Sequence, residues 1–358
     1  MKEKSLPGTV DPASPPTALA PMQNVTDHAF LHVIAEIGPP DFFFTEYFAI
    51  HATSGLDQGT LRSIKENQTG RPVFAQVLGN NADSLAESGS ELEKLPVAGV
   101  DLNLGCPAPK IYKRNAGGGL LRNPDLVDQV IATMRGALRG CFSVKCRLGF
   151  SDDSAFDECL ESVARHDVDF LTIHGRTVRQ MYRGEVDYGS MRRAVERLDC
   201  PVFANGNLTS AKVALSVLAE TGCRGAMIGR AAIRNPWIFR QIRELSRNAE
   251  MFRPSLQDVR TYIEMLNTAK FDAEIEDRYR IAHLKRYLIF IGEGVDAAGR
   301  FLHEVRRVSD EKELFQVCDR HLIENGNAEK LFSDEPFANL VARPNCEYVK
   351  KCDPVKRS

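Results

Sequence analysis

Eight short apolar runs that alternate with amphipathic stretches constrain the fold of this 358-residue chain more than any other feature. Asn123 before Pro124 and Thr209 before Ser210 are residue types that begin helices, so helices are predicted over 125–138 and 210–221, with others over 154–166 and 236–245. Short strands that are each followed by a helix favour a closed (β/α)8 TIM barrel over an open sheet. The predicted strands are Thr17–Met22, Phe42–Phe48, Pro72–Leu78, Val100–Leu104, Phe142–Leu148, Phe170–His174, Pro201–Asn205 and Gly225–Ile228.

The barrel is predicted to span residues 17–248 and to be followed by a second, helical domain. Amphipathic stretches over 259–271 and 280–290, with no strand pattern between them, predict a C-terminal helical bundle over 249–325. Residues 1–16 carry four prolines and predict an extended, flexible lead-in. Residues 326–358 are polar, with three further prolines, and predict a loosely held tail.

Composition excludes several classes of protein. The 46 Lys and Arg residues balance 48 Asp and Glu residues, so the net charge of −2 does not fit a strongly basic, histone-like binder. No apolar run approaches the roughly 20 residues of a membrane-spanning helix, and the first residues have no signal-peptide core, so we expect a soluble cytoplasmic protein. The nine cysteines form no CxxC pair, which predicts neither a disulfide framework nor a metal site.

Polar residues end nearly every predicted strand. In a TIM barrel the carboxyl ends of the strands meet at the face that carries active sites, so these side chains are expected to gather there. They are Pro21-Met22-Gln23, Thr45-Glu46, Gln76, Asn103 to Pro107, Lys145 to Arg147, His174-Gly175-Arg176, Asn205-Gly206-Asn207 and Gly229-Arg230.

The last two strand ends have the features of a phosphate site. Gly206 leaves backbone N–H groups accessible, and Gly229-Arg230 directly precedes the next helix, whose N-terminus can face an anion. Asn-Gly and Gly-Arg are also common in ordinary turns, but their joint place after strands seven and eight favours a phosphate cup.

Lys145 and His174 are predicted to lie at neighbouring strand ends, beside Gln76 and Asn205. A fixed lysine stabilises negative charge that develops on a heterocycle, which suits a flavin. A surface lysine and a buried structural histidine are the alternatives for isolated residues.

The segment Asn103–Arg122, NLGCPAPKIYKRNAGGGLLR, is the most specific in the chain. It combines Cys106 with three glycines at 117–119 and four cations, which is typical of a loop that moves over an anionic substrate. A thiol with a pKa near 8.5 is protonated at neutral pH and can act as a general acid. A structural cysteine in a solvated turn remains the alternative.

Taken together, the motifs resemble those of the tRNA-dihydrouridine synthases over Ala20 to about Asp319. That family resemblance implies an FMN-dependent TIM barrel with a C-terminal tRNA-binding domain, which uses NADPH to reduce the C5–C6 bond of a D-loop uridine. The motifs are APMQNVTD from Ala20, AQVLG from Ala75, NLGCPAPKIYKRNAGGGLLRNP from Asn103, VKCRLG from Val144, IHGRT from Ile173, ANGN from Ala204 and MIGR from Met227.

The resemblance also implies roles for individual residues. Cys106 would give a proton to uracil C5 while C6 receives a hydride from the flavin, and Asn103 and Arg176 would orient the uracil. The residues implied to hold FMN are Pro21, Met22, Gln23, Gln76, Lys145, His174, Asn205, Gly206, Asn207, Gly229 and Arg230.

A basic segment of the helical region is the candidate tRNA surface. The sequence from Arg278 to Arg307 contains seven cations and three acids. Two pairs of these cations, 278 with 285 and 300 with 307, are seven residues apart, and each pair is therefore predicted to lie on one helix face. A charge run of this kind is otherwise a solvated helix face. RIAHLKRYLIFI and HEVRRVSD resemble the C-type bacterial branch, which implies tRNA contacts by Tyr182, Lys285 and Arg306.

Two other functions remain open at this stage. A small-molecule flavin oxidoreductase of the dihydroorotate-dehydrogenase type shares the barrel and the phosphate cup, although a small substrate needs no basic helical domain. The second is an RNA-binding or chaperone protein that retains the barrel without turnover. No nicotinamide-binding motif is visible, so NADPH rests on the resemblance, and the sequence indicates neither the target uridine nor the oligomeric state.

Overall fold

The computed structural model describes residues 6–7, 11–51, 55–270 and 276–342. Parallel strands form a barrel in the order β1-β9-β8-β7-β6-β5-β4-β2, with β3 also paired to β4. A bridge between Ala18 and Phe42 brings the two ends of this sheet together, and the Leu19 N–H donates to the Phe42 carbonyl over 3.1 Å. The TIM-barrel prediction is therefore confirmed. The strands are β1 Thr17–Leu19, β2 Phe43–Phe44, β3 Phe48–Ala49, β4 Val73–Leu78, β5 Gly99–Leu104, β6 Phe142–Arg147, β7 Phe170–His174, β8 Val202–Asn205 and β9 Gly225–Ile228.

Two predicted strands differ from the structure. Pro21 cannot donate to a ladder, and the Met22 carbonyl accepts from the N–H groups of Val25 and Thr26, so β1 stops early and Met22 lies in a turn. The run Phe42–Phe48 is divided into β2 and β3. At the division, the Thr45 hydroxyl accepts from the Gln76 N–H over 3.1 Å in place of a backbone carbonyl.

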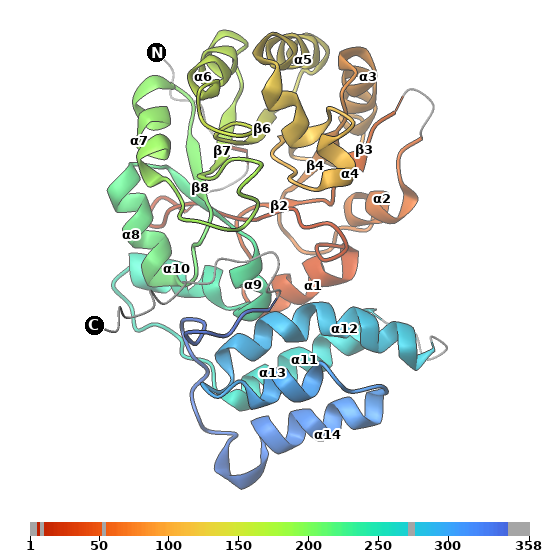
Figure 1. The fold of residues 1–358 in the computed structure, drawn as a ribbon, viewed down its shortest axis with the longest axis vertical. Coiled ribbons are helices and arrows are strands. Elements are labelled where there is room, and N and C mark those ends of the chain that lie inside the picture. The colour runs from red at the N-terminus through yellow and green to blue at the C-terminus, as the bar shows by residue number, and fades with distance from the viewer. Residues whose placement is uncertain (1–5, 8–10, 52–54, 271–275, 343–358) are drawn as a thin grey trace, which may run out of the picture.

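Helices cover the outside of the barrel (Figure 1). Asn123 caps α5 as predicted, because its side chain accepts from the Leu126 N–H. The predicted cap Thr209 is wrong by one residue, since Ser210 caps α8. The helices are α1 His28–Ile37, α2 Gln58–Lys65, α3 Ala82–Leu92, α4 Pro109–Tyr112, η1 Gly117–Arg122, α5 Pro124–Ala137, α6 Phe156–Arg165, α7 Tyr188–Arg197, α8 Ala211–Thr221, α9 Arg230–Arg234 and α10 Ile238–Ser246.

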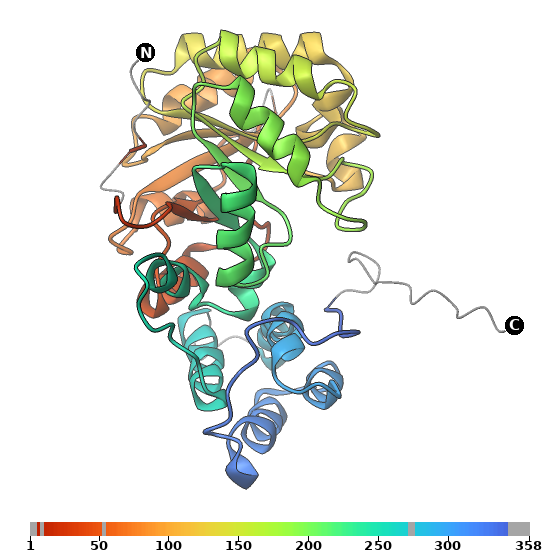
Figure 2. The same ribbon diagram turned by 90° about the vertical axis from the view of Figure 1, so that its left-hand side faces the viewer.

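The chain continues into helices that pack at one end of the barrel region (Figures 1 and 2). Tyr262 and Tyr287 connect the two parts, because their buried hydroxyls donate to the carbonyls of Ile233 and Val25 over 3.1 and 2.9 Å. No helix in the described ranges is long and apolar enough to span a membrane. These elements are α11 Leu256–Lys270, α12 Asp277–Ile291, η2 Gly292–Gly294, α13 Arg300–Val305, α14 Glu311–Leu322 and η3 Glu324–Gly326.

An aromatic cluster fills the interior of the barrel. Phe44 and Phe74 stack with ring centroids 4.9 Å apart, and Phe170 meets Phe74 edge to face at 5.3 Å. Residues two apart on a strand face the same side. The polar residues that follow Phe74, Phe170 and Phe203 by two or four positions therefore lie above this cluster, at the carboxyl ends of the strands.

Candidate active site

Strand register brings the predicted polar residues into rows at the barrel mouth. Gln76 lies beside Asp101, and Asp101 lies beside Ser143, on β4, β5 and β6. One step further along, Asn103 pairs in register with Lys145. Arg147, His174 and Asn205 form the outermost row on β6, β7 and β8. The barrel therefore brings together residues that are up to 129 positions apart.

A buried network links Gln76 and Asn103. The Gln76 Nε2 donates to Asp101 Oδ2 over 2.7 Å, and the Asn103 Nδ2 donates to Gln76 Oε1 over 2.8 Å. Ser143 Oγ donates to the other Asp101 oxygen over 2.6 Å. Burial raises the pKa of Asp101 to about 7, although these two donors and Lys145 oppose the shift.

Cys106 lies just past the end of β5. The Asn103 Oδ1 accepts from the N–H groups of Gly105 and Cys106 over 3.0 and 2.9 Å, which shapes the turn that carries the thiol. Gly117 approaches so closely that a Cβ there would lie 3.0 Å from the Cys106 Cβ. Burial raises the pKa of the Cys106 thiol, which therefore keeps its proton at neutral pH.

Lys145 and His174 both face the mouth. The Lys145 Nζ donates to Asn205 Oδ1 over 3.3 Å, while the Asn205 Nδ2 donates to the Met227 carbonyl over 2.8 Å. Burial and the charge of Arg147 lower the pKa of Lys145 to about 8. Burial, together with the charges of Arg147 and Lys145, lowers the pKa of His174 well below its ordinary value, so the ring is neutral.

Arg176 fixes the tautomer of that ring. Its Nη1 lies 3.3 Å from His174 Nε2. Because a guanidinium only donates, Nε2 accepts and the ring proton resides on Nδ1. The Arg176 side chain is fully buried, and its Nη2 also donates to the Gly184 carbonyl over 2.9 Å. In this structure Arg176 therefore contacts the loop that follows β7.

Two guanidinium groups lie near the Tyr182 ring. The Cζ atoms of Arg147 and Arg230 are 5.5 and 4.7 Å from its ring centroid. Burial lowers the pKa of Arg147 to about 10, and the nearby charges of Arg176 and Arg230 lower it further. The mouth therefore carries an excess of positive charge.

The glycines predicted to form a phosphate cup adopt special geometry. Gly206 has a φ of +117°, and a Cβ there would lie 2.8 Å from His174 Cδ2. Asn207 follows at a φ of +49° with its side chain exposed. Gly229 precedes α9 with no side-chain cap on the helix, and a Cβ on Gly229 would lie 3.4 Å from Met22 Sδ.

Residues 21–23 sit at the edge of the mouth. Pro21 and Met22 are half-buried in the turn after β1. The exposed Gln23 donates from Nε2 to Glu46 Oε2 over 2.9 Å, and Glu46 also accepts from the Val25 N–H. The Gln23 amide thus contacts a carboxylate of the neighbouring strand end.

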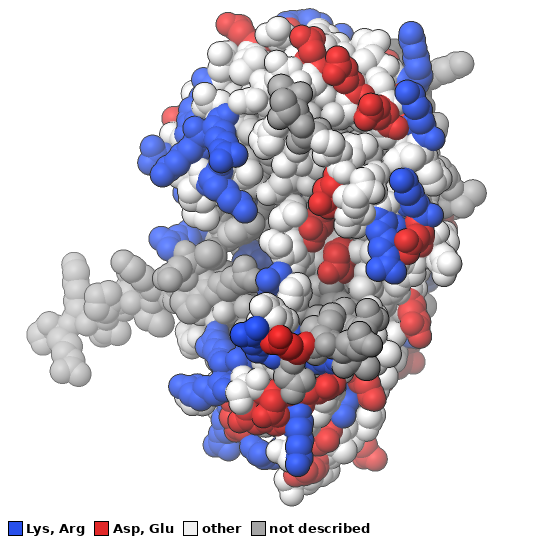
Figure 3. Space-filling model, turned by 90° about the vertical axis from the view of Figure 1, so that its right-hand side faces the viewer, with Lys and Arg blue, Asp and Glu red and all other residues white. Residues whose placement is uncertain are grey.

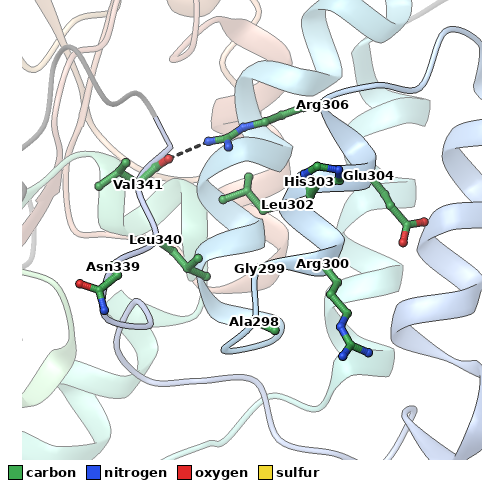
Figure 4. Close-up of a pocket in the computed structure, with 10 residues that line it drawn as sticks. All are labelled: Ala298, Gly299, Arg300, Leu302, His303, Glu304, Arg306, Asn339, Leu340 and Val341. Atoms are coloured by element: carbon green, nitrogen blue, oxygen red, sulfur yellow. Dashed lines mark hydrogen bonds between the residues drawn. The ribbon is translucent and has the colours of Figure 1, made fainter.

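The predicted tRNA residues of the helical region lie together. The Lys285 Nζ donates to the Arg306 carbonyl over 3.0 Å, and the Arg306 Nη2 donates to the Val341 carbonyl over 2.7 Å. Figure 4 shows this second bond across a pocket of about 440 Å³ between α13 and residues 339–341. Figure 3 shows Lys and Arg side chains along the left-hand edge of the molecule, on the barrel and on the helical region below it.

One of the seven cations in the segment 278–307 is buried. Arg280 is 7% exposed and forms an ion pair with Glu311 at 3.5 Å, because α12 turns this residue toward α14. Arg278, by contrast, is exposed, and its Nε lies 2.6 Å from Glu276. The expectation of seven surface cations is therefore wrong for Arg280.

The sequence did not single out Asp101, and it placed Arg147 at a strand end without a role. Asp101 occurs within an apolar strand, two positions before Asn103, and this alternation indicated that both face the same side. Arg147 is 2% exposed and donates to the carbonyls of Gly105, Thr177 and Met181. No local pattern in the sequence indicates that Arg147 donates to three backbone carbonyls.

Comparison with known proteins identifies the family. The model for dihydrouridine synthase (Dus) matches residues 18–327. The chain belongs to the dihydrouridine synthase family. The resemblance predicted from the motifs is therefore confirmed.

Bacterial relatives match this chain over much of their length. A tRNA-dihydrouridine(16) synthase of Neisseria meningitidis serogroup B is 30% identical over 84% of this chain and 92% of the relative. A tRNA-dihydrouridine synthase B of Proteus vulgaris is 33% identical over 66% of this chain and 73% of the relative. An old yellow enzyme homologue from Zymomonas mobilis aligns with a TM-score of 0.42 at 12% identity, over 66% of this chain and 89% of that one.

Proposed function

We propose that this synthase reduces the C5–C6 double bond of a D-loop uridine in tRNA, with FMN as cofactor and NADPH as reductant. The observation that carries the proposal is the placement of the Cys106 thiol beside a cationic barrel mouth. The family match and the relatives named as tRNA-dihydrouridine synthases support the substrate class.

The residues at the mouth fit an FMN group. Lys145, Arg147, Arg176 and Arg230 all lie close enough to His174 to lower its pKa. Burial and the charge of Arg230 lower the pKa of Arg176 to about 10. An anionic phosphate and an electron-accepting ring would balance this positive excess.

The residues proposed to hold FMN divide by position. Arg230, the start of α9 and the backbone at Gly206 and Gly229 would bind the phosphate, with Asn207 beside them. Lys145 and Gln76 would contact the polar edge of the ring, supported by His174 and Asn205. Pro21, Met22 and Gln23 would line the outer edge of the ring site. When bound and reduced, FMN supplies the hydride that uracil C6 receives.

The protein residues would complete the reaction. Asn103 and Arg176 would orient the uracil through its carbonyl oxygens, with Tyr182 beside it; the buried Arg176 would first have to release the Gly184 carbonyl. The Cys106 thiol would give its proton to C5, so that C5 and C6 each gain one hydrogen, and the thiolate would then regain a proton from water. The raised pKa of this thiol supports the role of acid. The tRNA body would rest on Lys285 and Arg306.

The test is an anaerobic experiment that follows flavin absorbance. The purified protein is reduced with NADPH and then mixed with tRNA lacking dihydrouridine, with tRNA already rich in dihydrouridine, or with free uridine. Reoxidation by the first RNA alone supports the proposal. Reoxidation by a free pyrimidine would instead assign a small-molecule oxidoreductase, and absence of bound flavin would refute the cofactor assignment.

A further inference from the structure

A chain of hydrogen bonds at the barrel mouth ends at the carboxylate of Asp101. The Cys106 N–H donates to Asn103 Oδ1 over 2.9 Å, and the Asn103 Nδ2 donates to Gln76 Oε1 over 2.8 Å. The Gln76 Nε2 then donates to Asp101 Oδ2 over 2.7 Å. Ser143 supplies the bond to Asp101 Oδ1. Each donor of the chain therefore points toward Asp101.

This direction leaves neither amide a choice of orientation. Above its pKa of about 7 Asp101 is ionised and its carboxylate only accepts, so the Gln76 NH2 group faces Asp101 and its oxygen faces Asn103. The Asn103 NH2 group then faces Gln76, which leaves its oxygen for the N–H groups of Gly105 and Cys106. A reversed Asn103 amide would place its NH2 group against two backbone donors.

Burial makes a reversed orientation of either amide costly. Gln76 and Asp101 are both fully buried, so water does not replace a lost partner. Unmet donors and acceptors in such a place are costly, and bonds in one chain strengthen one another. Asn103 retains one amide hydrogen beyond its bond to Gln76, and this donor is directed by the same chain.

We propose that Asp101 is the positioning residue of this site, which sets the amide orientations of Gln76 and Asn103 and thereby the place of the Cys106 thiol. Asp101 is fully buried and its oxygens accept from Gln76 and Ser143, so it acts through its neighbours. The inference rests on the proposed function for its catalytic consequence, whereas its effect on the Cys106 loop is independent of any substrate.

The experiment compares three variants in two assays. Asp101→Leu removes the acceptor, and Asp101→Asn keeps an oxygen that accepts from Gln76. Asp41→Leu is the matched control, because Asp41 is also buried and accepts two bonds, both from Thr17, at β1. The first assay measures iodoacetamide labelling of the Cys106 peptide by mass spectrometry, without tRNA and with or without FMN. The second measures flavin reoxidation by tRNA.

Asp101→Leu is expected to change both readouts. Labelling of Cys106 rises about tenfold, because loss of one acceptor loosens every bond of a buried chain. Flavin reoxidation by tRNA slows by about 100-fold, as is usual for a reacting group displaced by about 1 Å. Asp101→Asn changes either rate by less than about tenfold. Asp41→Leu lowers thermal stability and leaves both rates as in the wild type.

Two results would overturn the inference. One is equal labelling and reoxidation in Asp101→Leu and Asp41→Leu, which would make Asp101 merely structural. The other is an Asp101→Asn variant as impaired as Asp101→Leu, which would assign the effect to charge and not to amide orientation. If Asp101→Leu does not fold, Asp101→Ala is measured with the same expectations. A wild type inactive on tRNA would refute the proposed function, while the labelling result would still decide the role of Asp101.

Discussion

Arg147 on β6 donates from Nε to the carbonyl of Gly105 over 2.9 Å, one residue before Cys106. Its Nη1 donates to Thr177 and Met181 over 2.9 and 2.7 Å, in the loop that leads to Tyr182. One buried guanidinium thus joins the loop of the proposed acid to the loop of the proposed substrate residues. The relative position of the two loops depends on this side chain.

Replacement of Arg147 tests that connection. Arg147→Met leaves three carbonyls without their donor, so the free energy of unfolding in urea should fall by about 3 kcal/mol. Arg165→Met is the control, because this arginine is 59% exposed and pairs with Asp128 at the surface, where an ion pair contributes less than about 1 kcal/mol. Equal losses in the two variants would contradict a joining role for Arg147.

Removal of the thiol separates cofactor binding from turnover. Cys106→Ala should retain flavin absorbance, because the Asn103 oxygen still accepts from the N–H groups of residues 105 and 106 and holds the turn, yet slow tRNA reduction by about 10²- to 10⁴-fold. Cys141→Ala changes a half-buried cysteine next to the start of β6; this variant is the control and should turn over normally. Normal turnover by Cys106→Ala would exclude Cys106 as the proton donor.

The sequence predicted the barrel and most of the polar residues at its mouth. Strands and helices have different hydrophobic periods, so each can be recognised locally in the sequence. Their regular alternation predicts a barrel, and the structure confirms it. The strand ends placed Gln76, Asn103, Lys145, His174 and Asn205 at one face, where the register now puts them in rows. Their roles, and the division into domains at residue 249, stay predictions.

What the sequence did not predict depends on distant partners. The run Phe42–Phe48 reads as one strand because nothing local reveals that the Thr45 hydroxyl takes the Gln76 N–H. Arg280 reads as a surface cation because its partner Glu311 lies 31 positions away on α14. Burial of a charged side chain is set by tertiary packing, which no motif encodes.

The affinity for FMN should depend on pH through Lys145. The pKa of Lys145 is lowered to about 8, so the ammonium loses its proton as the pH rises past that value. An anionic cofactor favours the protonated form, and binding then requires proton uptake above pH 8. The Kd for FMN should rise between pH 7.5 and 9.5, by at most about tenfold per pH unit.

Lys145→Met serves as the comparison for this pH dependence. Methionine cannot titrate. The Kd of the variant for FMN should therefore be higher than that of the wild type at pH 7.5 and should not change up to pH 9.5. Fluorescence quenching of added FMN measures both proteins. An identical slope in wild type and variant would assign the titration to another group and remove Lys145 from the ring site.

The salt dependence of tRNA binding tests the basic surface. Phosphate contacts release counterions, so the slope of log K against log salt counts the cations that participate. Lys285→Ala and Arg306→Ala should each reduce that slope by about 1. The bonds of Arg306 to residues 341 and 342 use Nη2, which leaves the charge and Nη1 for a phosphate. Arg165→Met, on α6, should leave the slope unchanged. Slopes equal to the wild type in both test variants would place the tRNA elsewhere on the molecule.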